Sequence, residues 1–343
     1  AGPTELRESL VFDNTSAFGG GVYLFNNNKL VLLRSEVSDN TASSDGGGVF
    51  GAGVILVEST VSDNTAGRDG AGLFIQEDDG PVGSTIINST VAFNEAERHG
   101  GGLYLDFSGT LELFNVTVGF NVADRDGDNA GDGGGLFVDA GTVRPRHSIF
   151  GGNLDGSPGG VSAPDCSGPV ESAGRNLFSS IDFAVCQTSG AFASDFVGSL
   201  GSPLDPGLEP CLENVGEGVF STLALLDDSP AVDAGDPAGC LSVGGSTLEG
   251  DQLGNRRIWD GPDPDDIARC DLGAVELGAP SLTLIFRDGF ESADLSAWSA
   301  VIQPSPARAP APAWAPSTRA PAPSTLAERL RALVGPSRGG CPK

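Results

Sequence analysis

The sequence has no methionine, has lysine only at Lys29 and Lys343, and has histidine only at His99 and His147. The missing methionine indicates a processed product or an internal fragment, and no basic segment followed by an apolar stretch indicates a signal peptide. No apolar run approaches the roughly 20 residues that cross a bilayer, so we expect no membrane span. With two histidines and no Cys-x-x-Cys pair, a structural zinc site is not expected.

Positive charge is also scarce, because 46 acidic residues oppose 19 basic ones and give a net charge of −27. Such a charge repels nucleic acid and anionic membranes, so neither is an expected partner. The balance reverses after Val301, where six basic residues stand against one acidic residue. We expect a monomer with an exposed, soluble surface.

Glycine is abundant, with 51 residues, and it recurs together with asparagine in a repeated pattern. Each repeat carries Val-x-x-Asn or a close variant, a polar linker, a glycine cluster and a short apolar segment, as in "VSDNTAGRDGAGLFI" from Val61. The asparagines are Asn14, Asn40, Asn64, Asn94, Asn121 and Asn153. Their spacings of 26, 24, 30, 27 and 32 residues are typical of a solenoid.

The segments between the asparagines predict strands that bend. Leu111 and Leu113 share one face, whereas Val116 and Val118 share a face of the opposite parity, which requires a corner between them. The repeat therefore predicts coils of about three short strands stacked in parallel. We expect each Asn to adopt a left-handed backbone at a corner and to bond to its copy one coil away, and each glycine cluster to make a tight turn. A helical solenoid is not expected, since no segment before residue 300 keeps a 3.6-residue apolar period.

The repeats resemble the right-handed parallel β-helix superfamily, the pectin-lyase-like fold. The blocks that follow, "GRNLF" (174–178), "SPAVDAGDPAGC" (229–240), "DQLGNRRIWDG" (251–261) and "CDLGAVE" (270–276), are similar to those of the choice-of-anchor Q domain family. "FRDGFESADLSAWS" (286–299) resembles a short C-terminal segment of secreted proteins from Gram-negative bacteria. The resemblance implies a right-handed, single-stranded parallel β-helix located outside a bacterial cell, and it implies no defined activity.

The expected fold is therefore all-β, a parallel β-helix with an irregular, disulfide-containing C-terminal extension and a disordered tail. We predict β-helix repeats over residues 1–160, a choice-of-anchor-Q-like continuation and cap over 161–278, the short C-terminal segment over 279–300 and a Pro/Ala-rich basic tail over 301–343. A helix of about ten residues is expected near Thr325 to Val334. The tail is either an anchor or wall-spanning linker, or a low-complexity sequence that follows a natural end near Trp298.

Six cysteines lie outside the repeats, and disulfides in an oxidising compartment account for them better than metal ligation. The resemblance implies the pairs Cys240–Cys270 and Cys166–Cys186. Cys211 and Cys341 would then be left over.

A calcium site is a candidate in the longest linker, where Asp124, Asp126, Asp128 and Asp132 alternate with other residues. The linker departs from the EF-hand pattern at Asn129 and Gly135, so the alternative is a solvated acidic turn. The stretch 260–266 carries the same two alternatives.

Candidate catalytic residues are few. Enzymes of this fold that act on polyuronides carry paired carboxylates, or Ca²⁺ with an arginine base, and the usual motifs are absent. His99 and His147 are interpreted as corner or surface residues, and Arg34, Arg144 and Arg146 as strand residues with no acidic cluster at a definite spacing.

Other polar and aromatic residues suggest a binding face. Phe25, Phe74, Tyr104, Phe107 and Phe137 lie on or just after the apolar segments that follow the glycine clusters, and they suggest a glycan-binding face. Several of these five must belong to the core instead. Asn14, Asn88 and Asn115 stand in Asn-x-Ser/Thr sequences, which corner or strand positions explain.

We therefore expect a secreted or cell-surface structural or adhesive module whose partner is a glycan or another surface protein. The alternative is a lyase or hydrolase of acidic polysaccharides. An enzyme would gather carboxylates or an Arg–Asp set in one groove along the coils, whereas an adhesin would present an aromatic or Asn-rich face.

Overall fold

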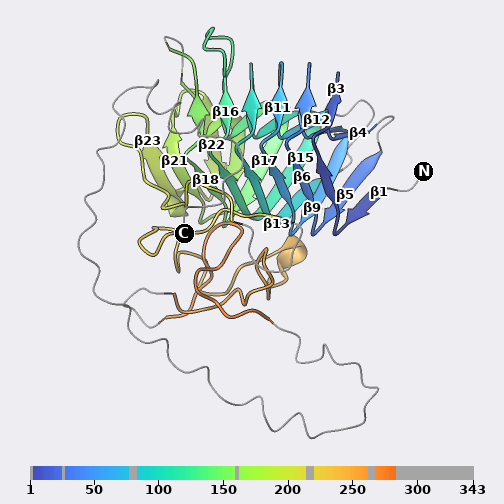
Figure 1. Cartoon of the computed structure of the whole chain (residues 1–343). Coiled ribbons are helices and arrows are strands. Elements are labelled where there is room, and N and C mark those ends of the chain that lie inside the picture. The colour runs from blue at the N-terminus through green and yellow to red at the C-terminus, as the bar shows by residue number, and fades with distance from the viewer. Residues whose placement is uncertain are drawn as a thin grey trace, which may run out of the picture. The chain divides into compact units, whose positions relative to one another are not determined.

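A computed structural model describes residues 3–24, 28–76, 83–158, 162–213, 220–261 and 267–282. The described residues form the predicted all-β parallel solenoid, which confirms the fold class (Figure 1). Figure 1 shows the strands of successive coils side by side, with the short strands β3, β11 and β16 along one edge. The predicted basic tail and its helix lie outside the described residues, as does all but the beginning of the segment 279–300.

Each coil contributes up to three strands to a 17-stranded sheet and one two-residue strand to a 6-stranded sheet. Three rows of short strands begin the large sheet. The first row holds β4 (Val22–Tyr23), β8 (Val49–Gly51) and β12 (Leu73–Gln76), and the second holds β1 (Thr4–Arg7), β5 (Lys29–Leu33) and β9 (Gly53–Val57). The third row holds β2 (Leu10–Phe12), β6 (Glu36–Ser38) and β10 (Thr60–Ser62). Longer strands then continue these rows around the bends: β13 (Ser84–Ala92), β15 (Leu103–Gly119) and β17 (Leu136–Arg146). The second sheet holds β3 (Thr15–Ser16), β7 (Thr41–Ala42), β11 (Thr65–Ala66), β14 (Glu95–Ala96), β16 (Val122–Ala123) and β19 (Leu154–Asp155).

The parallel ladder continues past residue 160. Its last strands are β18 (Ile149–Gly151), β20 (Cys166–Ser172), β21 (Leu177–Ile181), β22 (Cys186–Gly190) and β23 (Phe196–Ser199). The chain then becomes irregular, with isolated antiparallel bridges and a 3₁₀ turn at Val243–Gly245. We call the described part of residues 200–282 the C-terminal extension.

Equivalent residues of successive coils stack in register and build the core. Val37, Val61, Val91 and Val118 pair in sequence across β6, β10, β13 and β15, and all four are fully buried. Parallel strands lie about 4.8 Å apart, so each aliphatic side chain packs on its counterpart in the next coil. This stacking explains why the same residue types return in each repeat.

The asparagines form a continuous ladder along one corner of the coils. Asn64 illustrates the pattern, since its backbone N–H and its Nδ2 both donate to Asn94 Oδ1, at 3.1 and 2.9 Å. Asn40, Asn94 and Asn121 repeat these two bonds to the next Asn. The ladder ends where Asn153 Nδ2 donates to the buried Asp165, 3.0 Å away. Burial raises the pKa of Asp165 to about 7.

The expected left-handed backbone of these asparagines is wrong, because the residue before each Asn adopts it instead. Asp13, Asp39, Asp63, Phe93 and Phe120 have φ values between +55° and +57°. The corner thus turns one residue earlier, and the Asn that follows bonds through its amide to the next coil. Phe tolerates the position in two coils, so the conformation is set by the stacking of coils rather than by local preference.

Glycines are required next to this ladder for two separate reasons. Gly46 opens its cluster with φ +70°, and Gly19, Gly70, Gly100 and Gly133 open theirs with φ between +54° and +71°. The expected tight turn is therefore present in these clusters. Gly48 has another role, since a Cβ there would lie 2.9 Å from Asn64 Nδ2 and 2.7 Å from Gly72 O. The cluster and the Asn therefore belong to one motif, in which glycine makes room for the amide of the neighbouring coil.

A second corner carries another polar ladder, which the sequence reasoning missed. It turns at Asn115, which has φ +53° and lies where the parity of the apolar residues changes. The backbone N–H groups of Ser9, Ser35 and Ser59 each donate to the serine Oγ one coil on, at 3.1 to 3.2 Å. A Ser two residues before Val11, Val37, Val61 and Val91 marks this corner in the sequence, whereas Val116 takes its place before Val118.

The C-terminal extension packs on the outer side of β6, β10, β13, β15 and β18. Small residues there make room for it, and a Cβ on Gly151 would lie 2.7 Å from Pro206 while one on Gly119 would lie 2.8 Å from Leu223. A second apolar cluster results, which includes Ile149, Leu208, Leu223, Leu225 and Leu272.

Disulfides lie near and within the extension. Both pairs that the resemblance implies, Cys166–Cys186 and Cys240–Cys270, are bonded. Cys211 is also disulfide-bonded, so the expectation that it is left over is wrong, and its partner lies outside the described residues.

Candidate functional site

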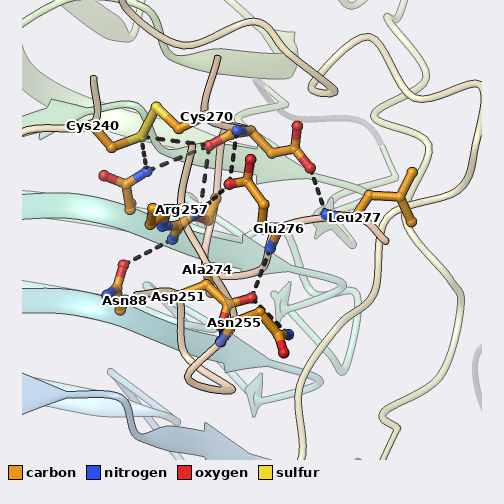
Figure 2. Close-up of polar contacts among 12 residues, drawn as sticks. Asn88, Cys240, Asp251, Asn255, Arg257, Cys270, Ala274, Glu276 and Leu277 are labelled. Carbon is orange, nitrogen blue, oxygen red and sulfur yellow. Dashed lines mark hydrogen bonds and ion pairs between the residues drawn. A yellow bond between two sulfur atoms is a disulfide. The ribbon is translucent and has the colours of Figure 1, made fainter. Parts of the chain in front are cut away.

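Residues from three of the blocks that carry the family resemblance, 229–240, 251–261 and 270–276, meet in a buried seam between the extension and the coils (Figure 2). At its centre Arg257 is fully buried and donates through Nη2 to Asn88 Oδ1 (2.8 Å) and to the Gly273 carbonyl (2.7 Å). Asn88 returns a bond to the Gly250 carbonyl at 2.7 Å. A buried guanidinium is costly without acceptors, so these bonds, which come from both the β-helix and the extension, hold the extension on the β-helix.

The carboxyl groups of the seam are also buried and bonded to the backbone. Asp271 accepts from the N–H groups of Asp233 and Leu277, and Asp251 accepts from those of Asn255 and Glu276. Burial raises the pKa of Asp271 to about 6. Burial and the neighbouring Asp271 raise the pKa of Glu276, whose Oε2 lies 3.5 Å from Arg257 Nη1. None of these groups faces solvent, so the seam is structural.

The residues of two Asn-x-Ser/Thr sequences and one of the histidines belong to the same seam. Asn115 Nδ2 lies 2.8 Å from Cys240 Sγ, and Asn88 and Asn115 are both buried at the second corner, as their corner interpretation requires. His147 is buried at the same corner, not on the surface, and burial with the adjacent Arg146 lowers its pKa to about 4. His147 lies near both sulfur atoms of Cys240–Cys270, but a disulfide offers no thiolate to a metal.

The acidic loop gathers three of the four predicted calcium ligands. Carboxylate oxygens of Asp124, Asp126 and Asp128 lie within 4.8 Å of one another, whereas Asp132 lies outside this group. Both oxygens of Asp124 accept backbone N–H groups, from Asp128 (3.0 Å) and Asn129 (3.1 Å). These bonds are those of an acidic turn, and three carboxylates supply only part of the six to eight oxygens that Ca²⁺ takes. Calcium binding stays a prediction.

The aromatic residues stack into a ladder along the outer side of β4, β8, β12, β15 and β17. It consists of Tyr23, Phe50, Phe74, Tyr104 and Phe137, with ring centroids 4.6 to 5.3 Å apart. The sequence reasoning included three of these five, while Phe107 lies in the core and Phe25 lies outside the described residues. His99 extends the ladder, with its ring centroid 4.3 Å from that of Phe137.

The stacking limits what the aromatic ladder can bind. Adjacent rings from Phe50 to Tyr104 are within 6° of parallel and cover each other, so Phe74 and Tyr104 are only 6% and 9% exposed. A sugar stacks on the face of a ring, and these faces are already occupied by neighbouring rings. Tyr23 is the exception at 45% exposure, because it ends the ladder.

A different side of the β-helix is open. Outward side chains of β5, β9 and β13 form a half-buried aliphatic surface in register, which we call the open face: Val31, Leu33, Ile55, Val57 and Ile87. Their inward neighbours Leu32, Leu56 and Ile86 are fully buried in the core. Alternation along a strand thus places apolar residues on both sides of these strands. Apolar surface with polar borders commonly marks a binding site.

Charged side chains border both ends of the open face, beside two pockets. At one end a pocket of about 310 Å³ contains Arg7, Glu8, Arg34 and Glu58, and Arg34 pairs with Glu8 at 2.5 Å. At the other end Arg144 Nη1 lies 2.9 Å from Glu112 and its Nε lies 3.4 Å from Glu171. The sequence showed no acidic cluster at a definite spacing from these arginines, and the structure supplies the partners from other coils. The partners stand 26 to 32 residues away in sequence, one coil apart, where local spacing gives no signal.

Comparisons with protein-family models, with curated proteins and with solved structures give no match for this chain. Within the part of the chain that the structure describes, no helix has the length and apolarity needed to cross a membrane.

Proposed function

We propose that this chain is a secreted or cell-surface β-helix of the choice-of-anchor Q type that acts as a structural or adhesive module and binds glycan along the open face. The observation that carries the proposal is the set of five aliphatic side chains held in register on three adjacent strands, between charged pairs at both ends. The C–H faces of sugar rings suit such a surface, and the bordering charged groups suit their hydroxyls.

Two further features support this proposal. Disulfides persist in oxidising compartments, and the extension of this chain is disulfide-bonded. Arg257, Asp271 and Glu276, which belong to the blocks of the resemblance, are buried in the seam, where they stabilise the fold. A rigid coil stack with a covered side and an open side is suited to display a binding surface.

A glycan array with two matched double variants tests the proposal. Replacing outward Ile55 and Val57 by Glu places charge on the open face without touching the core, and we expect array signal to fall to background. Replacing Leu10 and Phe12 by Glu is the control, since both are 46% exposed on another strand. If the two double variants give the same array signal as each other, or if the wild-type protein binds no glycan on the array, glycan binding on this face is refuted.

The alternative, an enzyme acting on acidic polysaccharides, is favoured by one observation. Glu112, Arg144 and Glu171 come together beside a pocket, which is the kind of grouping an enzyme of this fold would need. Both carboxylates are, however, paired to the same arginine, which leaves neither of them free to face a substrate without breaking an ion pair. A uronide-cleavage assay decides between the two, because turnover lost in Glu112→Gln would replace the adhesive proposal.

A further inference from the structure

The pocket at the Arg144 end joins the β-helix to the extension. We call it the arginine pocket, and it has a volume of about 250 Å³ and is lined by Glu112, Phe114, Arg144, Arg146, Ala173 and the segment 242–245. Roughly eight water molecules occupy this volume in the bulk liquid. Pockets that enclose drug-sized ligands start at roughly 300 Å³, so this pocket is smaller than those. The pocket therefore suits one ring-sized group.

The two arginines of this pocket differ in how their charge is satisfied. Arg144 faces Glu112 and Glu171, although its Nε is too poorly aligned with Glu171 to form a hydrogen bond. Arg146 has a buried Nε with no hydrogen-bond partner, and among the described residues no ion pair reaches its guanidinium. A buried donor without an acceptor costs about 1–3 kcal/mol, and more for a charged group. Arg144 and Arg257 also have an Nε without a partner, but each faces a carboxylate, so Arg146 is the arginine of this group that can accept an anion from outside the chain.

The remaining walls favour an anion with an apolar body. Phe114 and Ala173 provide apolar surface, and Gly244 and Gly245 bring backbone close without side chains. Besides burial, Arg146, Arg257 and Arg175 lower the pKa of His147 while Asp236 raises it, so three arginines and one aspartate lie near this corner. The segment 242–245 follows Cys240, whose disulfide to Cys270 ties it to the seam.

We propose that the arginine pocket binds the carboxylate of a small, ring-sized organic acid, with Arg146 supplying paired N–H donors and Phe114 contacting the ring. A planar guanidinium forms two parallel hydrogen bonds to a carboxylate, which a lysine cannot reproduce. The acid is either a sugar acid or a hydrocarbon acid, since both share a ring and a carboxylate. The proposal does not rest on glycan binding by the open face, because it concerns one pocket and a small ligand.

Titration calorimetry on the full chain with its disulfides intact tests this site at fixed ionic strength. The probes are sodium galacturonate and sodium cyclohexanecarboxylate. Acetate lacks the ring, galactose lacks the carboxylate, and sulfate is an anion that lacks both. We expect at least one ring acid to bind about tenfold or more tightly than the three partial ligands. The ring acid that binds more tightly shows whether the ligand is a sugar acid or a hydrocarbon acid.

Three variants assign the binding to Arg146. Arg146→Gln should weaken the ring acid by about tenfold or more, and Arg146→Lys should weaken it less while keeping the charge. Arg68→Gln is the matched control, because Arg68 pairs with Asp45 and lines neither of the two pockets, and it should bind as the wild type does. If Arg146→Gln does not fold, as judged by its thermal unfolding, the Arg146→Lys variant carries the test. Wild-type affinity in both Arg146 variants, equal binding of sulfate, or no binding of either ring acid would overturn the proposal.

Discussion

Removing one amide from the middle of the asparagine ladder should cost far more stability than removing the amide at its exposed end. Asn94 is fully buried, and its Oδ1 accepts the backbone N–H and the Nδ2 of Asn64. Its own Nδ2 donates to Val61 O, Ala92 O and Asn121 Oδ1, at 2.9 to 3.1 Å. Asn94→Ala therefore removes bonds to two coils at once.

The size of the effect follows from what each partner retains. Asn64 Nδ2 keeps Val37 O and Asn121 Oδ1 keeps the Asn94 backbone N–H, but the Asn64 N–H loses its side-chain acceptor. An orphaned buried N–H costs about 1–3 kcal/mol, and each other lost bond adds about 0.5–1.5 kcal/mol before relaxation. We expect Asn94→Ala to lower the free energy of unfolding by about 3–5 kcal/mol.

Asn14→Ala supplies the comparison within the same ladder. Asn14 is exposed, and Asn40 Oδ1 keeps the Asn14 backbone N–H after its side chain is gone. The expected loss is below about 1 kcal/mol. Urea unfolding of both variants with disulfides intact, followed by circular dichroism, measures the difference. If Asn94→Ala loses no more stability than Asn14→Ala, the ladder does not stabilise the coils as argued.

Three further predictions concern the extension, a buried carboxyl and the acidic loop. Gly151→Ala should make the extension more sensitive to limited proteolysis than Gly119→Ala does. The added methyl group at Gly151 meets the rigid ring of Pro206, whereas the one at Gly119 meets the Leu223 side chain, which can turn away. Equal cleavage of the two variants would contradict this packing. The pKa of Asp165 is about 7 in the fold against 3.8 as its ordinary value, so its contribution to stability is full below about pH 4 and is lost as pH rises through 7. The stability of the wild type relative to Asp165→Asn should thus fall by about 4 kcal/mol between these pH values, and a flat difference across urea melts would refute the shift. Calorimetry at millimolar Ca²⁺ should give heat that Asp126→Asn reduces, and no heat would end the calcium prediction.

The repeated pattern was informative because a solenoid presents the same environment in every coil. The valines, the asparagines and the first glycine of each cluster recur at spacings of one coil, so a single sequence predicts both the strand solenoid and the amide ladder. The backbone conformation of the Asn was predicted wrongly. Local preference favours a left-handed Asn, whereas the stacked coils place that turn on the preceding residue, even when it is Phe93.

The binding residues were harder to predict because their neighbours come from other coils. Nothing in the sequence around Arg144 indicates Glu112, which lies one coil earlier and faces it at 2.9 Å. The aromatic residues were recognised, yet only their stacking showed that most ring faces are covered. Arg257 gave no local signal, because its acceptors lie on Asn88 and Gly273, far apart in the chain.

The sequence by itself determined the coil, since each residue of a repeat must match the residue one turn away in size, polarity and backbone freedom. Only the tertiary structure decided which side of the coil stack the extension covers, which aliphatic residues remain open, and that Arg146 has no ion pair among the described residues. These depend on contacts between segments that are unrelated in spacing, and such contacts are fixed by packing in space rather than by periodicity.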